Sequence, residues 1–432
     1  MKEDFIAWLW KYRLLYGHRL QTTTGEPVEI IDPGLENNNS GPDFLAARVR
    51  IGETLWAGNV ELHVCSSMWY GHQHHLDPAY DNIILHVVHN HDREVCKQNN
   101  ESIPHLEIKG RYDPKLHHNY QLLLNSRSWI PCERLINRVD NFILQHWLTR
   151  LLVGRLARKA DELKQYLYYF DNHWEKTFLF AVARSLGGKA NAGTFGMLIQ
   201  RTPWHVLAKN HDQLPLVEAL LFGQAGLLSG TFQDPYVCRL QTNHHYLQKK
   251  YALPAPLAPS LWKYSRMRPA NFPDIRIAQL AGIINKTEAR PFMAASVDLS
   301  AEDIYHLFAV STSEYWSEHY RFGKPSATCH KQLGQTTIYR IFINTLAPAL
   351  CIYGKEKQLS GWIGRAVSLL EQLPPEENGI IREWRRIVPA PTNAAETQGL
   401  LELRKQYCVP KKCLQCSLGH VILSRPTKQP EA

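Results

Sequence analysis

The chain has 432 residues, enough for two or three ordinary domains, and 44% of them are hydrophobic, which argues against a disordered chain. No apolar run reaches the roughly 18 residues that a membrane span needs, and the acidic start at Met1–Asp4 lacks the features of a secretory signal. Nine unevenly spread cysteines do not suit a disulfide framework. We therefore expect a soluble, cytoplasmic protein that does not contact a membrane.

The net charge of +9 is divided unevenly along the chain. Residues 1–125 hold 11 Lys/Arg and 16 Asp/Glu, a net charge of −5, whereas the remaining residues hold 38 basic and 24 acidic side chains, a net charge of +14. An acidic part joined to a basic part fits a metal site beside a surface that binds a polyanion. A basic surface without a partner explains the same charge equally well.

Residues 1–133 show the pattern of a mixed α/β domain. Apolar residues recur first at helical spacing and then in alternating or continuous runs that are typical of strands. The predicted elements, in chain order, are a helix at 3–16, strands at 44–51 and 55–64 that form a hairpin, a His-rich loop with a short helix at 66–80, and strands at 82–89 and 103–109.

Residues 134–407 show helical periodicity and are expected to form a basic, all-helical domain. A Cys-rich C-terminal tail at 408–432 follows, so the fold class is α+β. The predicted helices are at 142–168, 174–186, 214–228, 274–285, 337–346, 359–372 and 395–407.

The predicted hairpin carries the residues of a candidate catalytic site. Asp43 stands where its first strand begins, and Glu61 and His63 are two residues apart on the second strand, so both point to the same face. Two carboxylates and a basic side chain would then converge on one point. Such a site can hold Mg²⁺ or Mn²⁺ and position a water that attacks a phosphodiester.

This pattern resembles the PD-(D/E)xK nuclease superfamily, in which an acidic residue opens one core strand and a (D/E)-x-K triplet lies on the next. Pro42-Asp43 and Glu61-x-His63 match it, with His63 in place of the lysine. The resemblance implies a restriction-endonuclease-like domain in which Asp43 and Glu61 bind the metal and His63 orients or deprotonates the water. A hairpin with chance polar residues remains the alternative, and a second triplet, Glu107-x-Lys109, has no suitable acidic partner.

Nearly the whole chain also resembles a bacterial domain-of-unknown-function family. That resemblance implies family membership without a particular activity. It rests on Asn39–Phe44, Gly58–His63, His72-x-His74, Asp77, Tyr80-Asp81, Ile84–Val88, Arg268–Pro273 and Cys413-Leu414-x-Cys416.

Histidines suggest a rival site. Eleven of the 21 histidines precede residue 125, and His63, His72, His74 and Asp77 could together bind a transition metal such as Zn, Mn or Fe. That set would make the protein a His-rich metal hydrolase. A His-x-His loop on the surface needs no metal, however, and His86 on the buried strand is expected to be a satisfied core histidine.

Three C-terminal cysteines form a third constellation. Cys408, Cys413 and Cys416 can supply three ligands to a zinc ion or an iron–sulfur cluster, with Cys132 as the preferred fourth ligand and His420 as the other candidate. A distant cysteine followed by three near the C-terminus loosely resembles the iron–sulfur subgroup of the same nuclease superfamily. Packing of these cysteines in the core is the alternative.

The sequence thus predicts a metal-dependent nuclease-like protein that uses Mg²⁺ or Mn²⁺ and binds nucleic acid through its basic helical part. The alternative from another class is a non-catalytic nucleic-acid-binding or scaffold protein with a degenerate nuclease fold. The His-rich metal hydrolase is the third reading. No P-loop is present, so any motor would be a separate protein partner.

Overall fold

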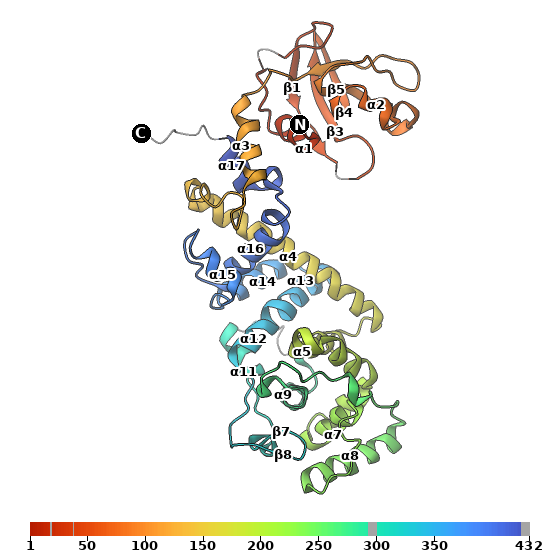
Figure 1. Ribbon diagram of the computed structural model, residues 1–432. Coiled ribbons are helices and arrows are strands. Elements are labelled where there is room, and N and C mark those ends of the chain that lie inside the picture. Colours follow the sequence, from red (N-terminus) through yellow and green to blue (C-terminus); the bar gives the residue numbers. More distant parts are fainter. Residues whose placement is uncertain (18–19, 38, 293–299, 425–432) are drawn as a thin grey trace. The chain divides into compact units, whose positions relative to one another are not determined.

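The computed structural model describes residues 1–17, 20–37, 39–292 and 300–424 (Figure 1). The chain forms two compact units. Unit 1 comprises Met1–Trp147 and Leu403–Ala432, and unit 2 comprises Leu148–Glu402.

The C-terminal segment belongs to unit 1, whereas the sequence suggested a separate tail after residue 407. Cys413, Leu414 and Leu423 are buried in the same apolar core as the N-terminal sheet, and this packing joins the two ends of the chain. The first boundary also moves from residue 133 to residue 147, because the long helix α4 (Asn141–Tyr169) begins in unit 1.

Unit 1 is built on a mixed sheet with short helices (Figure 1). Its other helices and its strands are α1 (Glu3–Lys11), β1 (Val28–Asp32), β2 (Leu35–Glu36), β3 (Phe44–Ile51), β4 (Thr54–Cys65), α2 (Met68–Gly71), β5 (Ile83–Asn90), β6 (His105–Glu107), α3 (Pro114–Asn125) and α17 (Ser417–Ser424). Single 3₁₀ turns lie at His74–Leu76, Pro78–Tyr80, Ile136–Arg138 and Cys413–Gln415, and a π-helical turn lies at Arg404–Cys408.

The strand order in the sheet is β1-β3-β4-β5-β6, with β2 paired to β3. The predicted hairpin is confirmed: β3 and β4 are antiparallel, with Phe44 opposite Val60 and Ile51 opposite Thr54. From β4 onward the pairing is parallel, so that Glu61 lies beside His86 and His86 lies beside His105.

The two faces of this sheet differ in chemistry because successive side chains of a strand point to opposite sides. One face packs in a core with α1 and carries apolar side chains of β4, β5 and β6, including Leu62, Leu85 and Leu106. The alternate positions of the same strands carry Glu61, His63, His86 and His105, all of them buried. We call this second side the histidine face.

Several predictions for unit 1 were wrong in detail. The first helix ends at Lys11, five residues early, because Arg13 adopts a left-handed conformation with φ of 51°. Strands β1 and β2 were not predicted. They are short, and Gly34 turns the chain between them at φ of 86°, where a Cβ would meet the Leu45 carbonyl oxygen at 2.5 Å. Helix α3 was also not predicted.

Unit 2 is mostly helical and has its own apolar core. Its helices are α5 (Trp174–Arg201), α6 (Trp204–Asn210), α7 (Leu214–Gln224), α8 (Pro235–Tyr251), α9 (Pro273–Lys286), α11 (Ala301–Phe308), α12 (Gln335–Ile341), α13 (Ala347–Glu356), α14 (Trp362–Glu371), α15 (Gly379–Trp384) and α16 (Ala394–Leu403), with a π-helical turn at Phe342–Leu346. The expectation of an all-α region is corrected by a small hairpin of β7 (His319–Arg321) and β8 (Lys324–Pro325). Among the described helices, none is both long and apolar enough to cross a membrane.

Candidate metal centre

Two carboxylates lie side by side where β3 begins. Asp43 directly precedes Phe44, which pairs with Val60, and this register sets Asp43 beside Glu61 on β4. The backbone N–H of Asp43 donates a hydrogen bond to Glu61 Oε2 at 3.1 Å, and the backbone N–H of Leu62 donates to Asp43 Oδ2 at 3.0 Å. The reciprocal bonds fix both carboxylates at one end of the hairpin.

This carboxylate pair resists double ionisation. Burial raises the pKa of Asp43 to about 7, and the charge of Glu61 adds to that rise. Burial likewise raises the pKa of Glu61 to about 8, although the N–H of Asp43 acts in the opposite direction. Two buried carboxylates that repel each other are stabilised by a shared cation.

A third carboxylate, Glu3, stands at this end of the sheet and was not singled out in the sequence. It lies in the first turn of α1, and its charge raises the pKa of both Asp43 and Glu61. Its Oε1 atom is buried without a hydrogen-bond partner among the described residues. The helical periodicity of α1 identified the apolar side chains of this helix. No local sequence pattern predicted that Glu3 lies near Asp43, which is forty residues further along the chain.

Three imidazoles meet next to the carboxylates. One nitrogen each of His63, His72 and His74 lies within 4.8 Å of the other two. Nε2 of His74 is 3.3 Å from Glu61 Oε1, and Nε2 of His63 is 3.7 Å from the same oxygen. Between His72 and His74 the chain turns at Gln73, which is left-handed at φ of 63°.

Burial lowers the pKa of two of these imidazoles, His63 and His74, and so favours their neutral form, which is the form that binds metals. It lowers the pKa of His63 to about 3, and the charges that His74 and His72 would carry lower it further. Burial lowers the pKa of His74 as well, although Asp43 and Asp77 oppose this shift. The ring of Tyr80 stacks on His74 at a centroid distance of 3.9 Å and covers the cluster.

His86 stands behind the cluster and can orient His63. The His63 Nδ1 and His86 Nε2 atoms are 2.8 Å apart in a buried hydrogen bond, while His63 Nε2 is 3.0 Å from His72 Nδ1. A proton on His63 Nδ1, shared with His86, makes Nε2 the nitrogen that carries a lone pair, on the side where His72 lies and an ion could bind. Outer hydrogen-bond partners commonly orient metal-binding histidines in this way. His86 is therefore only partly satisfied, since its Nδ1 is buried without a partner among the described residues.

The donors at this point are carboxylate oxygens from Asp43 and Glu61 and imidazole nitrogens from His63, His72 and His74. Mg²⁺ prefers oxygen ligands and keeps several waters, whereas imidazoles with carboxylates suit Mn²⁺, Fe²⁺ or Zn²⁺. The mixed donor set thus fits a transition-metal ion better than Mg²⁺.

The family model described as "Protein of unknown function (DUF2851)" matches residues 3–379. The chain belongs to this family. Neither a curated protein nor a solved structure matches it. Within the DUF2851 match lie all the carboxylates and histidines of the candidate metal centre, while Cys408, Cys413 and Cys416 follow its end.

The structure also places the remaining sequence candidates of this DUF2851 protein. Asp77, expected to join the histidines, instead accepts a hydrogen bond from the Ala79 N–H at the start of a 3₁₀ turn. Glu107 of the second triplet accepts a hydrogen bond from the His91 N–H. The predicted cysteine ligands lie elsewhere in unit 1: all three C-terminal thiols are buried, and Cys132 is partly buried.

Proposed function

We propose that unit 1 is a metal-dependent phosphodiesterase with a nuclease-like core that acts on nucleic acid. The observation that carries the proposal is a cluster of three imidazoles, His63, His72 and His74, beside the hydrogen-bonded carboxylates Asp43 and Glu61, with Glu61 Oε1 3.3 Å from His74 Nε2. The hairpin followed by a parallel strand is the element order expected of such a core. A bound ion would polarise the phosphodiester and activate a water.

Each side chain has a distinct part in this proposal. Asp43 and Glu61 offer oxygen ligands, and His72 and His74 offer nitrogen ligands from the loop that covers the sheet. The sequence suggested that His63 orients or deprotonates water. Because its Nε2 atom lies with the other two imidazoles, we assign His63 to the ligand set and His86 to its orientation.

The charge distribution supports a polyanionic substrate. The part of the chain after residue 125 carries a net charge of +14. Within unit 2, a cavity of about 860 Å³ is lined by Lys159, Arg184, Lys189 and Arg340, against the two acidic residues Glu162 and Glu376. Basic side chains around a cavity bind phosphates without sequence preference and release counterions on binding.

The three-histidine cluster also favours a second candidate function, the His-rich metal hydrolase. Both candidates use the same ion and the same activated water, and they differ in the substrate. A phosphodiester substrate is preferred because the basic cavity of unit 2 suits phosphate groups. Activity on a carboxylic ester or amide, with none on nucleic acid, would favour the second candidate.

The test compares ion binding and cleavage in the full chain. Chelator-treated protein is titrated with Mn²⁺, Zn²⁺ and Mg²⁺ by calorimetry, and then assayed on single-stranded and double-stranded DNA and on RNA. We expect tight binding of Mn²⁺ or Zn²⁺, weak binding of Mg²⁺, and cleavage that requires the ion. Asp43→Asn and Glu61→Gln should lose both ion binding and cleavage. Glu53→Gln, the same chemical change on an exposed turn, should keep both.

Three outcomes would count against the proposal. Cleavage that survives in both site variants would move the site elsewhere. Ion binding without hydrolysis of any substrate, combined with nucleic-acid binding, would favour the non-catalytic alternative. Absence of ion binding in the wild type would end the metal-centre assignment itself.

Nucleic-acid binding is tested separately at unit 2. The double variant Arg184→Ala/Arg340→Ala should weaken binding of a fluorescent oligonucleotide, and added salt should weaken wild-type binding steeply. The control is Arg385→Ala/Arg386→Ala, which removes two arginines of the same unit that pair with Glu377 and Glu383. Equal losses in the two double variants would show that only overall charge matters.

A further inference from the structure

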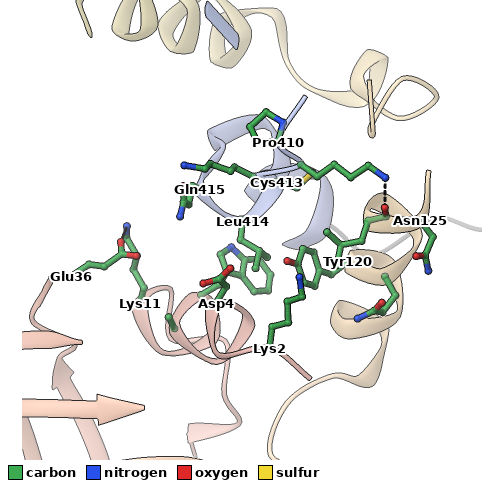
Figure 2. Close-up of a pocket in the computed structure, with 16 residues that line it drawn as sticks. Lys2, Asp4, Lys11, Glu36, Tyr120, Asn125, Pro410, Cys413, Leu414 and Gln415 are labelled. Atoms are coloured by element: carbon green, nitrogen blue, oxygen red, sulfur yellow. Dashed lines mark hydrogen bonds and ion pairs between the residues drawn. The ribbon is translucent and has the colours of Figure 1, made fainter. Parts of the chain in front are cut away.

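Unit 1 contains a cavity beside its first helix. Asp4, Ala7, Trp8 and Lys11 line it, and their spacing of three or four residues places them on one face of α1. The end of α3 and the C-terminal segment at Pro410–Gln415 form the other walls (Figure 2). The volume of the cavity is about 640 Å³, which is in the range of sites that enclose a small organic ligand.

This cavity is positively charged, although residues 1–125 carry a net charge of −5. Its charged lining consists of four lysines and two carboxylates, with a net charge of +2: Lys2, Lys11, Lys411, Lys412, Asp4 and Glu36. Lys11 pairs with Glu36 at 2.6 Å, whereas Lys2 and Lys412 are exposed and form no ion pair with another described residue. Two lysines of the lining are therefore available to an anionic ligand.

Two buried aromatic side chains of the cavity wall hold hydrogen-bond donors without acceptors. Trp8 is 3% exposed, and its indole N–H has no acceptor among the described residues. Tyr120 is 4% exposed, and its hydroxyl forms no hydrogen bond with another described residue. Burial, together with the charge of Asp4, raises the pKa of this hydroxyl to about 12, so it keeps its proton and can donate. Buried donors of this kind are satisfied by a ligand that brings acceptor oxygens.

Amide side chains and apolar side chains complete the lining. Gln121, Asn125 and Gln415 each offer an amide, which can both donate and accept hydrogen bonds. Leu124 and Leu414 offer apolar surface beside them. This combination suits an unpaired nucleobase, whose edge presents donors and acceptors that are already paired in a duplex.

The cavity is connected to the candidate metal centre through two segments of the chain. Glu36 lines the cavity, and the backbone N–H of the next residue, Asn37, donates a hydrogen bond to the carbonyl oxygen of Asp43 at 2.8 Å. Lys2 lines the cavity as well, and it is followed by Glu3, whose charge raises the pKa of Asp43. A ligand in the cavity is thus held by residues that adjoin the metal centre in the chain.

We propose that this cavity binds a single strand of nucleic acid beside the metal centre, with Lys2 and Lys412 on its phosphates and the amides on an unpaired base. The inference rests on the proposed phosphodiesterase function, and it narrows the substrate to single-stranded nucleic acid. Lysines contact phosphates without reading sequence, so we expect little sequence preference. The lining residues include none of the proposed metal ligands, so the strand should bind without the ion.

The experiment measures acetylation of lysines by mass spectrometry in the chelator-treated full chain, in which cleavage cannot interfere. The probes are a short mixed-sequence oligonucleotide, as DNA and as RNA, each alone or annealed to its complement, and inorganic phosphate. We expect the single strands to slow acetylation of Lys2 and Lys412 several-fold, and the duplexes and inorganic phosphate to have little effect. Lys109 and Lys115, two exposed lysines of unit 1 that do not line the cavity, are the controls.

A double variant tests the two phosphate contacts. Lys2→Gln/Lys412→Gln should weaken single-strand binding and lower the slope of log affinity against log salt by about 1.4, since each contact on a single strand contributes about 0.7. In the cleavage assay this variant should raise KM and change kcat little, because the metal centre is intact. The matched control Lys109→Gln/Lys115→Gln removes the same charge from unit 1 and should leave the salt slope and KM unchanged.

The outcomes separate this inference from the proposed function. Protection of Lys2 and Lys412 without ion-dependent cleavage of any substrate would overturn the phosphodiesterase and support the cavity as a site for single strands. Ion-dependent cleavage without this protection would overturn the cavity alone. Equal protection by a duplex or by inorganic phosphate would overturn the single-strand assignment. Equal losses in the two double variants would show that overall charge, and not the cavity, holds the strand.

Discussion

The two faces of the unit 1 sheet are formed by the same strands, but one face is packed with apolar side chains and the other carries a buried carboxyl group and buried imidazoles. On one face, Leu62, Leu85 and Leu106 pack in an apolar core together with the buried side chains of α1. On the histidine face, buried nitrogens of His86 and His105 lack partners among the described residues. Unpaired buried polar atoms destabilise a fold, so a row of buried histidines with such atoms, next to buried carboxylates, is evidence that this face has a function.

The largest effect on stability is expected on the apolar face. Leu85→Ala removes a fully buried side chain from the core of β5 and should lower the free energy of unfolding by roughly 2–5 kcal/mol. Hydrogen exchange of the β4 and β5 amides measures this loss in the sheet itself. The control Leu35→Ala, at a side chain 74% exposed, should change it by no more than about 0.5 kcal/mol. Similar losses in both variants would contradict the packing described for this face.

On the histidine face, the largest change in stability should come from binding a metal ion. A transition-metal ion at about 100 times its dissociation constant should stabilise the wild type by about 2.7 kcal/mol. Glu61→Gln should abolish that gain without lowering the stability of the metal-free protein, because a neutral amide replaces a carboxyl group that burial already keeps largely protonated at pH 7. Denaturation with and without the ion measures both quantities, with Glu53→Gln as control. A large loss of metal-free stability in Glu61→Gln would make this face structural.

His86 sharpens the comparison, because it binds no ion in our proposal. His86→Phe should weaken metal affinity by about 10–100-fold, since His63 loses the partner that orients it. His86→Gln, which keeps a polar atom near the position of Nε2, should recover part of the affinity. The control is His89→Phe on the same strand, which leaves the His63 bond intact. Affinity unchanged in His86→Phe would show that His63 needs no orienting partner.

The pH dependence of the metal-free protein is the smallest expected effect. The folded carboxylates Asp43 and Glu61 have pKa values of about 7 and about 8, so the native state holds protons that the unfolded chain has released. Their stabilising contribution is complete below pH 4 and is lost as the pH rises to 8. His63, with its pKa lowered to about 3, acts in the opposite direction only below the unfolded histidine value of about 6.5.

Above pH 6.5 the carboxylates therefore dominate, and the free energy of unfolding should fall by up to about 1.4 kcal/mol per pH unit for each group. Urea titrations at pH 6.5, 7.2 and 8 measure the slope. The free energy of unfolding should fall less steeply with pH in Asp43→Asn, and also in the wild type when an ion is bound at the site. A slope that Asp43→Asn leaves unchanged would assign the effect to other groups.

Local sequence patterns predicted much of the fold. The strands β3, β4 and β5 lie within one or two residues of their predicted bounds, because alternating or continuous apolar runs determine them. The predicted helix at 274–285 agrees with α9 to within one residue at each end, because a regular pattern of apolar residues also determines this element. Strands β1 and β2 were missed because they are short and lie beside Pro27, Pro33 and Gly34, which are typical of loops. The polar helix α8, with little apolar periodicity, was missed too.

The sequence by itself determined which residues share a face, because the two-residue period of a strand sets Glu61 and His63 on one side of β4 and the hairpin returns Asp43 to them. Which other side chains lie beside Asp43, Glu61 and His63 was decided only by the tertiary structure. Glu3 lies in the first turn of α1, and His72 and His74 flank a left-handed residue in the loop after β4. The periodicity of the local sequence does not predict such long-range contacts, because they depend on how distant segments pack against the sheet.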